Sequence, residues 1–166
     1  MTVEVREVSF DEHQAAGYIT AEAYREFVPP DDEDWTRYLT HIADVSGRTA
    51  RTVVLVAVED DRILGSATLE LEGRVTPDED PPLDPGEAHV RMLGVDPSER
   101  GRGLGSLLIA ECEARARAAG RTLMTLHTTR RMKAARSLYE SRGFVRGEDR
   151  VFPDGFELLS YAKSLG

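Results

Sequence analysis

Hydrophobic and polar positions along this chain follow the periods of strands and helices in turn. The β-branched run at residues 52–58 predicts a buried strand, and residues 62–71 return from an acidic turn to complete a hairpin. Residues 88–95 and 122–128 predict two more strands. In the segment 122–128, Leu123, Thr125 and His127 alternate with Met124, Leu126 and Thr128, so the two sets lie on opposite faces.

Four segments have helical spacing instead. The first begins at Ser9 or Asp11, either of which can cap it, and extends to about Phe27. The second begins within the acidic run at residues 31–34 and ends at Gly47, with the apolar positions Trp35, Tyr38, Leu39 and Ile42. Residues 106–119 and 132–142 predict the remaining two helices.

Both ends of the chain add strands to this pattern. Val3, Val5 and Val8 indicate an opening strand, and residues 144–151 and 156–162 indicate a terminal hairpin. The resulting order, β-α-α-β-β-β-α-β-α-β-β, predicts a mixed α/β sheet with helices on both faces. We expect a single domain over residues 1–166. The loop at residues 73–86 contains four prolines, and its length favours a functional or flexible role.

Charge is distributed unevenly over the chain. The net charge is −9, which argues against general affinity for nucleic acid. Residues 1–90 carry 21 acidic and 7 basic side chains, whereas residues 91–166 carry 9 and 14. The pattern fits either random surface asymmetry or two subsites, one for an anionic cofactor and one for a cationic substrate.

Other classes are disfavoured by composition. No apolar run approaches the roughly 18 residues of a membrane span, and the N-terminus does not resemble a signal peptide, so we expect no membrane partner and a cytoplasmic location. Cys112 is the only cysteine, which excludes an internal disulfide and a cysteine-based zinc cluster. Its helical spacing from Leu108 indicates a core residue.

The segment at residues 100–105, Arg-Gly-Arg-Gly-Leu-Gly, lies between a predicted strand and a predicted helix. Backbone N–H groups in the first turn of a helix have no intrahelical partner, and the helix dipole favours anions there. Glycines let phosphate oxygens approach these groups closely, and two arginines add positive charge. The segment therefore predicts a diphosphate site.

Two common nucleotide loops fit this segment poorly. A P-loop needs a lysine and a Ser or Thr after the last glycine, but Gly105 is followed by Ser106 with no lysine. A dinucleotide loop needs a third glycine where Ser106 stands, and an acidic residue about 20 positions on, where Arg121 and Thr122 occur.

A different pattern, R/Q-x-x-G-x-G/A, is matched by Arg100, Gly103 and Gly105. Residues 135–144 match a second motif, A-x-x-L-Y-x-x-x-G-F, at the correct distance, and residues 91–97 look like the strand that precedes the loop. With these features the chain resembles the GNAT superfamily of acyl-CoA-dependent N-acetyltransferases. The resemblance covers nearly the whole chain and is most specific over residues 88–145.

The resemblance implies a fold and a cofactor. The fold would have a mixed, mostly antiparallel sheet of about seven strands and about four helices, with strands 4 and 5 splayed apart. Acetyl-CoA would bind in that cleft as co-substrate, with no metal. Its pantetheine arm would pair with the main chain around Leu93, Gly94 and Val95. The diphosphate would bind the backbone of residues 100–106, namely Arg100, Gly101, Arg102, Gly103, Leu104, Gly105 and Ser106.

Three side chains at the rim of this cleft are further cofactor candidates. Arg102 is the side chain expected nearest the diphosphate. Arg136 is a candidate for the 3′-phosphate, with a solvated helix face as the alternative. Met132 stands where the family often has an asparagine that holds the cofactor, and a thioether cannot make that hydrogen bond.

Acetyl transfer to an amine needs a base for the ammonium proton and an acid for the leaving thiolate. Tyr139 matches the family's tyrosine near the sulfur of coenzyme A and is the candidate acid. The family's usual glutamate position is occupied by His89, whose ordinary pKa suits a base at neutral pH. Glu87 shares its strand face and could accept the proton, orient the imidazole or act through water. His127 is a weaker candidate for the same cleft.

The acceptor is less determined. The acidic residues 31–34 and the acidic loop favour a small cationic amine, and a peptide or protein amine, N-terminal or lysine, is the alternative. A non-catalytic acyl-CoA-binding regulatory module is a hypothesis of another class. Dimers are frequent in the family, but no segment of this sequence identifies a dimer interface.

Overall fold

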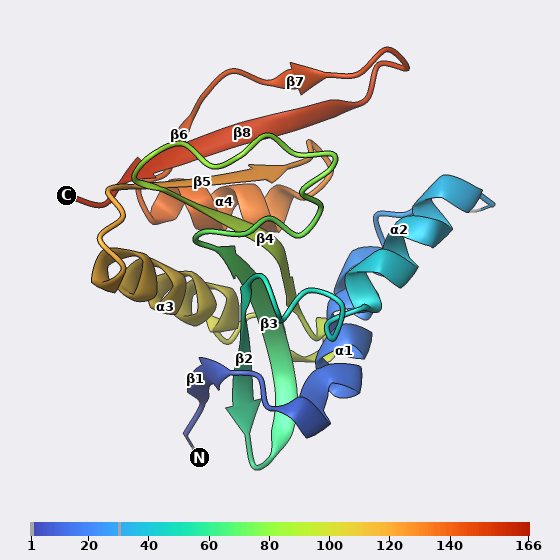
Figure 1. Cartoon of the computed structure of the whole chain (residues 1–166). Coiled ribbons are helices and arrows are strands. Elements are labelled where there is room, and N and C mark those ends of the chain that lie inside the picture. Colours follow the sequence, from blue (N-terminus) through green and yellow to red (C-terminus); the bar gives the residue numbers. More distant parts are fainter. Residues whose placement is uncertain (1, 30) are drawn as a thin grey trace.

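The protein, described here by a computed structural model of residues 2–29 and 31–166, is built around one eight-stranded sheet (Figure 1). The spatial order is β1-β2-β3-β4-β5-β8-β6, and β7 also pairs with β8. The strands are β1 (Glu4–Glu7), β2 (Val53–Glu59), β3 (Arg62–Glu70), β4 (Glu87–Val95), β5 (Leu123–Thr128), β6 (Val145–Arg146), β7 (Arg150–Val151) and β8 (Glu157–Ser164).

Four α-helices cover the two faces of this sheet: α1 (His13–Arg25), α2 (Glu33–Ala43), α3 (Leu104–Ala118) and α4 (Lys133–Ser141). Helices α1 and α2 lie on one side, and α3 and α4 on the other (Figure 1). The predicted mixed α/β architecture is confirmed, with eight strands rather than about seven. None of the helices in the described ranges is long and apolar enough to cross a membrane.

Two predicted elements differ from the structure. The segment 144–151 forms two short strands instead of one, because β6 and β7 pair with separate parts of β8. The second helix ends at Ala43, before Gly47. Here the buried Arg48 donates from Nη1 to the carbonyls of Ile42 (2.9 Å) and Asp44 (3.0 Å), and from Nε to Thr68 Oγ1 (3.1 Å). These bonds satisfy the helix end and hold α2 against β3.

The apolar core lies mainly between the sheet and the pair α3 and α4. Met124 and Leu126 of β5 face it, together with Leu108 and Cys112 of α3. A smaller cluster on the opposite face joins Met92 of β4 to α1, α2 and the loop after β3. The alternation predicted for residues 122–128 is therefore confirmed: Met124 and Leu126 enter the main core, and Thr125 and His127 do not.

Strand β4 bends at a bulge and then leaves β5. Ser66 of β3 is opposite Gly94 and Thr68 is opposite Arg91, so β4 carries one extra residue in this interval. Met92 has a left-handed φ of 53° there. A bulge bends its strand. The parallel pairing of β4 with β5 ends at Val90 and Leu126, which leaves Arg91–Val95 without β5 on their other edge.

Candidate active site

The glycine-rich turn enters α3 in the conformation that the sequence indicates. Gly101 and Gly103 have φ values of 84° and 75°, and Gly103 is the N-cap of α3. A Cβ atom built on either would meet nothing within 4 Å, so the conformation and not crowding selects glycine. The N–H groups of Leu104, Gly105 and Ser106 form the first turn and have no intrahelical acceptor. The turn thus presents a set of backbone donors that fits an anion.

The last part of β4 offers main-chain groups to a ligand. Asp96 N–H, just after β4, donates to the carbonyl of Leu64 in β3 at 2.8 Å. These two residues therefore form a hydrogen-bonded pair of the antiparallel ladder. In an antiparallel ladder the next pair, Gly65 and Val95, is not hydrogen-bonded, so the N–H and C=O of Val95 point away from β3. They point to the edge that β5 has left. This geometry fits an extended ligand chain that adds to β4.

The next strand residue, Gly94, has a packing reason of its own. A Cβ atom at Gly94 would come within 2.8 Å of the Ala23 side chain. Glycine therefore lets α1 lie directly against the strand that carries the open edge. Gly94 itself is paired with Ser66 of β3, so the main chain offered at the open edge is that of its neighbours Leu93 and Val95. The contact of these residues with pantetheine stays a prediction.

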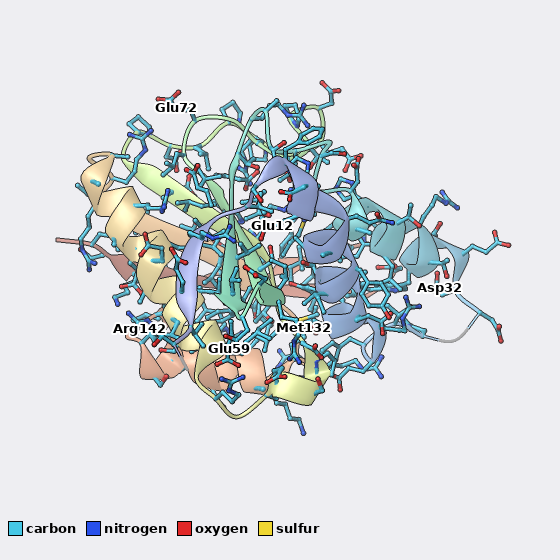
Figure 2. The ribbon with its side chains drawn as sticks, turned by 90° about the horizontal axis from the view of Figure 1, so that it is seen from below. Glu12, Asp32, Glu59, Glu72, Met132 and Arg142 are labelled. Carbon is cyan, nitrogen blue, oxygen red and sulfur yellow. The ribbon has the colours of Figure 1, made fainter. Side chains whose placement is uncertain are left out.

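The two arginines of the turn are paired with carboxylates. Arg100 forms an ion pair with Glu26 at the end of α1. Arg102 lies 2.6 Å from Glu59 and 2.7 Å from Glu99, and these bonds lower the pKa of both carboxyls. Glu59 comes from the end of β2, 43 positions earlier in the chain, and Figure 2 labels it near that end of the sheet. The positive charge of Arg102 is therefore largely balanced within the protein.

Two further predicted cofactor residues lie at the start of α4. The Met132 sulfur accepts a 3.4 Å hydrogen bond from Thr128 Oγ1, so it ties β5 to the helix N-cap. Arg136 reaches the Arg130 carbonyl at 3.5 Å, and its Nε is buried without a partner among the described residues. This nitrogen therefore keeps a donor that the described residues do not use.

Tyr139 of α4 is buried on the core face. Its ring packs against Phe144 and Tyr161, each with centroids 5.9 Å away. Burial, followed by the nearby Cys112 and Tyr161, raises the pKa of the Tyr139 phenol. The hydroxyl is therefore protonated throughout the physiological range and can donate but not readily ionise.

Glu87 and His89 are joined through a third residue, Thr125. Parallel pairing sets His89 of β4 beside Thr125 of β5. The Thr125 hydroxyl donates to Glu87 Oε2 at 2.5 Å, and Thr125 Oγ1 lies 2.7 Å from His89 Nδ1. Sequence reasoning identified the two outer members but gave Thr125 no role in the site. The missing signal was the register of the two strands, which the sequence does not state.

The surroundings of His89 favour its neutral form. Only 4% of its surface is exposed. Burial, and then His127, Arg74 and Arg91, hold the pKa of His89 well below 6.5. The His127 ring lies 5.1 Å away, and burial followed by Arg150 lowers its pKa too. A neutral imidazole can accept a proton at neutral pH. The role of His89 as the base stays a prediction.

The loop at residues 73–86 crosses this face and is attached to the strands below it. The buried Glu70, cross-strand partner of His89, accepts the Val75 N–H at 2.6 Å. Arg91 donates to Asp80 Oδ2 at 2.8 Å. Glu87 Oε1 accepts the Asp84 N–H at 2.9 Å. The loop is thus an ordered cover beside His89, held by residues of the same strands that form the candidate site.

Aromatic residues from two distant segments meet at the first turn of α2. Trp35 of α2 contacts Phe156, which precedes β8, with ring centroids 5.5 Å apart at a T-shaped angle. Tyr38 packs on Trp35, and Phe152 on Phe156. Asp32, the N-cap of α2, lies at the outward end of that helix (Figure 2). The contact ties α2 to the β7–β8 hairpin.

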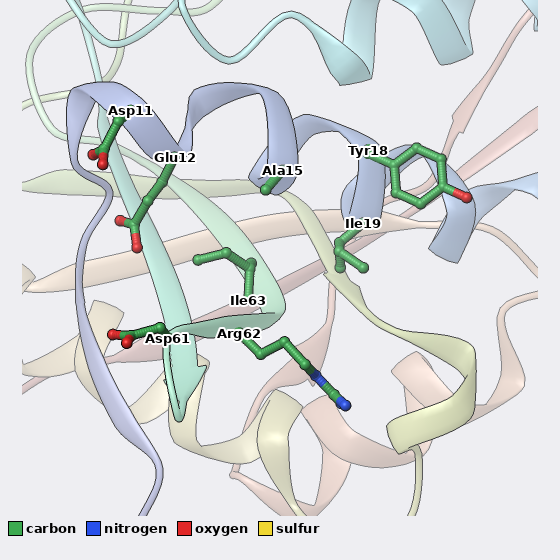
Figure 3. A pocket seen from close by; sticks show the side chains of 8 residues that line it. All are labelled: Asp11, Glu12, Ala15, Tyr18, Ile19, Asp61, Arg62 and Ile63. Atoms are coloured by element: carbon green, nitrogen blue, oxygen red, sulfur yellow. The ribbon is translucent and has the colours of Figure 1, made fainter.

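A hollow of about 520 Å³ lies elsewhere, between the start of α1 and the β2–β3 hairpin (Figure 3). Its lining includes Asp11, Tyr18 and Arg62. None of its lining residues belongs to the candidate site. Within residues 2–29 and 31–166, no group of three or more His, Cys, Asp or Glu side chains is arranged to hold a metal ion.

The comparisons with known proteins agree with this geometry. A model described as "Acetyltransferase (GNAT) family" matches residues 12–144. No curated protein matches significantly. Among solved structures, a GNAT-family protein of Desulfovibrio desulfuricans is similar with a TM-score of 0.74 and 21% identity, over 99% of this chain and 100% of that one.

Two other structures are similar over nearly their whole length. The ribosomal-protein-S18-alanine N-acetyltransferase of Escherichia coli has a TM-score of 0.70 and 19% identity, over 99% of this chain and 95% of that one. YncA of Salmonella typhimurium, solved with its cofactor acetyl-CoA, has a TM-score of 0.72 and 20% identity. The match covers 100% of this chain and 95% of that one. At these identities the structures show a shared fold, whereas the family model covers most of the chain. The chain belongs to the GNAT acetyltransferase family.

Proposed function

We propose that this protein transfers the acetyl group of acetyl-CoA to a primary amine by direct attack within a ternary complex. The observation that carries the proposal is the parting of β4 from β5 after Val90 and Leu126. It opens a main-chain edge next to the glycine-rich turn, and the neutral His89 lies at the point of parting. The neutral phenol of Tyr139 stands on α4, beyond β5.

The donor side fits acetyl-CoA through its backbone. The first-turn N–H groups of α3 receive the diphosphate, as expected of an anion at a helix N-terminus. The open edge of Leu93 and Val95 pairs with the pantetheine amides. Arg136, whose Nη1 lies at the exposed Arg130 carbonyl, offers a guanidinium for a phosphate contact at the start of α4. The likeness to YncA, which was solved with acetyl-CoA, supports the same donor.

The chain supplies a base and an acid for the transfer. Acetyl-CoA provides the acetyl group as an activated thioester. His89 takes the ammonium proton, since it is neutral and buried, and the freed amine forms the new C–N bond as the C–S bond breaks. Tyr139 gives its hydroxyl proton to the leaving sulfur, and the second proton that the nitrogen loses as the amide forms restores the phenol. No covalent intermediate on the enzyme is needed, because positioning of the two reactants supplies a large part of the rate.

A small cationic amine is the acceptor that we favour. The carboxylates of Asp78, Glu79 and Asp84 are on an exposed loop beside the site, and the N-terminal half of the chain is strongly acidic. The Trp35–Phe156 contact bridges the acceptor side, which favours a short molecule over an extended peptide. Aromatic faces next to carboxylates also suit an ammonium group.

A peptide amine is the second candidate. Its support is the fold likeness to the Escherichia coli enzyme that acetylates an alanine of ribosomal protein S18. A non-catalytic acyl-CoA-binding module is the third, and the paired presence of Tyr139 and a neutral His89 argues against it.

The test is release of free thiol from acetyl-CoA with a panel of polyamines, aminoglycosides, amino acids and short peptides. We expect saturable release with at least one small cationic amine, and mass spectrometry should show one added acetyl group on that amine. Saturation only with peptides would assign the second candidate. Background release with every amine, despite measurable binding of acetyl-CoA, would leave the non-catalytic module.

A further inference from the structure

We propose that Thr125 is a positioning residue that fixes the tautomer of His89, with hydrogen on Nδ1, so that Nε2 is the nitrogen that accepts the proton of the amine. The proposal rests on the proposed function for the role of Nε2. The fixing of the tautomer stands on the geometry of Glu87, Thr125 and His89 alone.

The direction of the hydrogen bonds follows from the chemistry of the three groups. An ionised carboxylate is only an acceptor, so the single hydrogen of the Thr125 hydroxyl is used toward Glu87 Oε2, at 2.5 Å. Thr125 Oγ1 then has only lone pairs for its second neighbour, His89 Nδ1, at 2.7 Å. That nitrogen must therefore donate. In a neutral imidazole with hydrogen on Nδ1, the lone pair is on Nε2.

The arrangement is held from several sides. Glu87 is fixed through its other oxygen by the Asp84 N–H of the covering loop. Thr125 belongs to β5, which pairs with β4 on one side and β8 on the other. The strand register alone therefore keeps Thr125 beside His89, and the loop orients the carboxylate that determines where the threonine hydrogen points.

Other groups around His89 do not select its tautomer. His127 on β5, Arg91 on β4 and Arg74 in the covering loop favour a neutral ring, and Glu70 on β3 is the cross-strand partner of His89. His127 is a ring neighbour at 5.1 Å. Arg91 is bonded to Asp80, and Arg74 lies 3.2 Å from Glu70. Among the described residues, Thr125 is the group that lies within hydrogen-bond distance of a His89 ring nitrogen.

The tautomer can be read without turnover. Long-range proton–nitrogen NMR spectra of ¹⁵N-labelled protein distinguish protonated from unprotonated ring nitrogens. The chain has four histidines, and His89→Gln assigns the signal of interest by its loss. We expect the wild type and Thr125→Ser to show protonated Nδ1 and free Nε2, because serine keeps the hydroxyl. Thr125→Val, which keeps the shape of the side chain, should lose this single tautomer.

A second variant removes the carboxylate that accepts the hydrogen bond of Thr125. In Glu87→Ala the threonine hydrogen is free to turn toward Nδ1, so the tautomer should shift to one with hydrogen on Nε2. Thr122→Val makes the same exchange at an exposed residue just before β5 and should leave the tautomer unchanged. Glu87→Ala keeps the proposal testable if Thr125→Val does not fold.

Kinetics complete the test. Thr125→Val should lower kcat about tenfold, the usual worth of one hydrogen bond, with the KM for acetyl-CoA unchanged, and Thr125→Ser should restore the rate. Hydrogen on Nε2 in the wild type, or the same tautomer in Thr125→Val and Glu87→Ala as in the wild type, would overturn the proposal. If the tautomer behaves as expected but no amine is acetylated, the proposed function fails and the positioning by Thr125 stands.

Discussion

The donor side and the acceptor side of this protein use different parts of the polypeptide. On the donor side we propose that backbone groups do the binding, because the turn before α3 and the open edge of β4 present N–H and C=O groups. On the acceptor side, side chains from β4, β5 and the covering loop form a hydrogen-bonded set around His89. Backbone recognition constrains the sequence mainly to glycines at fixed spacing, whereas side-chain recognition depends on register.

This difference explains why the cofactor was easier to identify than the substrate. Gly101 and Gly103 of the turn are required by positive φ values that other residues rarely adopt. They therefore form a motif that can be recognised in the sequence. The residues that face the acceptor are held by contacts between distant segments, such as Trp35 with Phe156. Variants that change coenzyme A affinity without changing kcat, or kcat without changing that affinity, test whether the two sides work independently.

The largest effect is expected for His89→Gln. Loss of a general base lowers kcat by about 100-fold or more, while the affinity for coenzyme A should stay the same because the ring is on the acceptor side. Thiol release gives the rate, and calorimetric titration with coenzyme A gives the affinity. A full rate in this variant would remove His89 from the mechanism and leave Glu87 or water as the base.

Tyr139→Phe comes next. The phenyl ring keeps the packing against Phe144 and Tyr161, so we expect a loss of unfolding free energy below about 1 kcal/mol. The loss of the acid should lower kcat by about 10- to 100-fold with little change in coenzyme A affinity. Unchanged turnover, with thermal unfolding confirming the fold, would show that the residue is only part of the core.

A smaller effect, confined to the donor side, is expected for Gly103→Ala. A left-handed φ of 75° strains alanine by about 1 kcal/mol, and relaxation of the turn should weaken coenzyme A binding about tenfold. Gly120→Ala is the matched control, since its φ is 79° and a Cβ there also meets nothing within 4 Å. Both variants should lose similar stability. Equal coenzyme A affinity in the two would contradict binding by the turn.

The smallest effect is expected for Arg102→Gln. Because Glu59 and Glu99 already pair with this guanidinium, its removal should change coenzyme A affinity by only about twofold at physiological salt. A much larger loss would mean that Arg102 leaves these carboxylates and contacts the diphosphate, as the sequence predicted. Titration at two salt concentrations distinguishes these outcomes.

Local rules predicted much of the fold. The positive φ of Gly101 and Gly103, the alternating faces of β5 and the four helices follow from short-range patterns. The split of the last hairpin into β6 and β7 does not, because it depends on how each pairs with β8.

The candidate site shows the same limit. His89 and Glu87 can be identified by residue type, but Thr125 comes to lie beside them only when β4 and β5 pair in parallel. The pairing of Arg102 with Glu59 likewise joins residues 43 positions apart and has no local signal. Contacts of this kind are set by tertiary packing, which a single sequence does not reveal.

The pH dependence of kcat tests the account most directly. Because burial, His127 and two arginines depress the pKa of His89 below 6.5, the neutral base persists at pH 7 and is lost as the pH falls through that lowered pKa. With saturating amine, we predict an acidic limb below pH 6.5 in the wild type and in His127→Gln, and no such limb in His89→Gln. An acidic limb that persists unchanged in His89→Gln would contradict the assignment of His89 as the base.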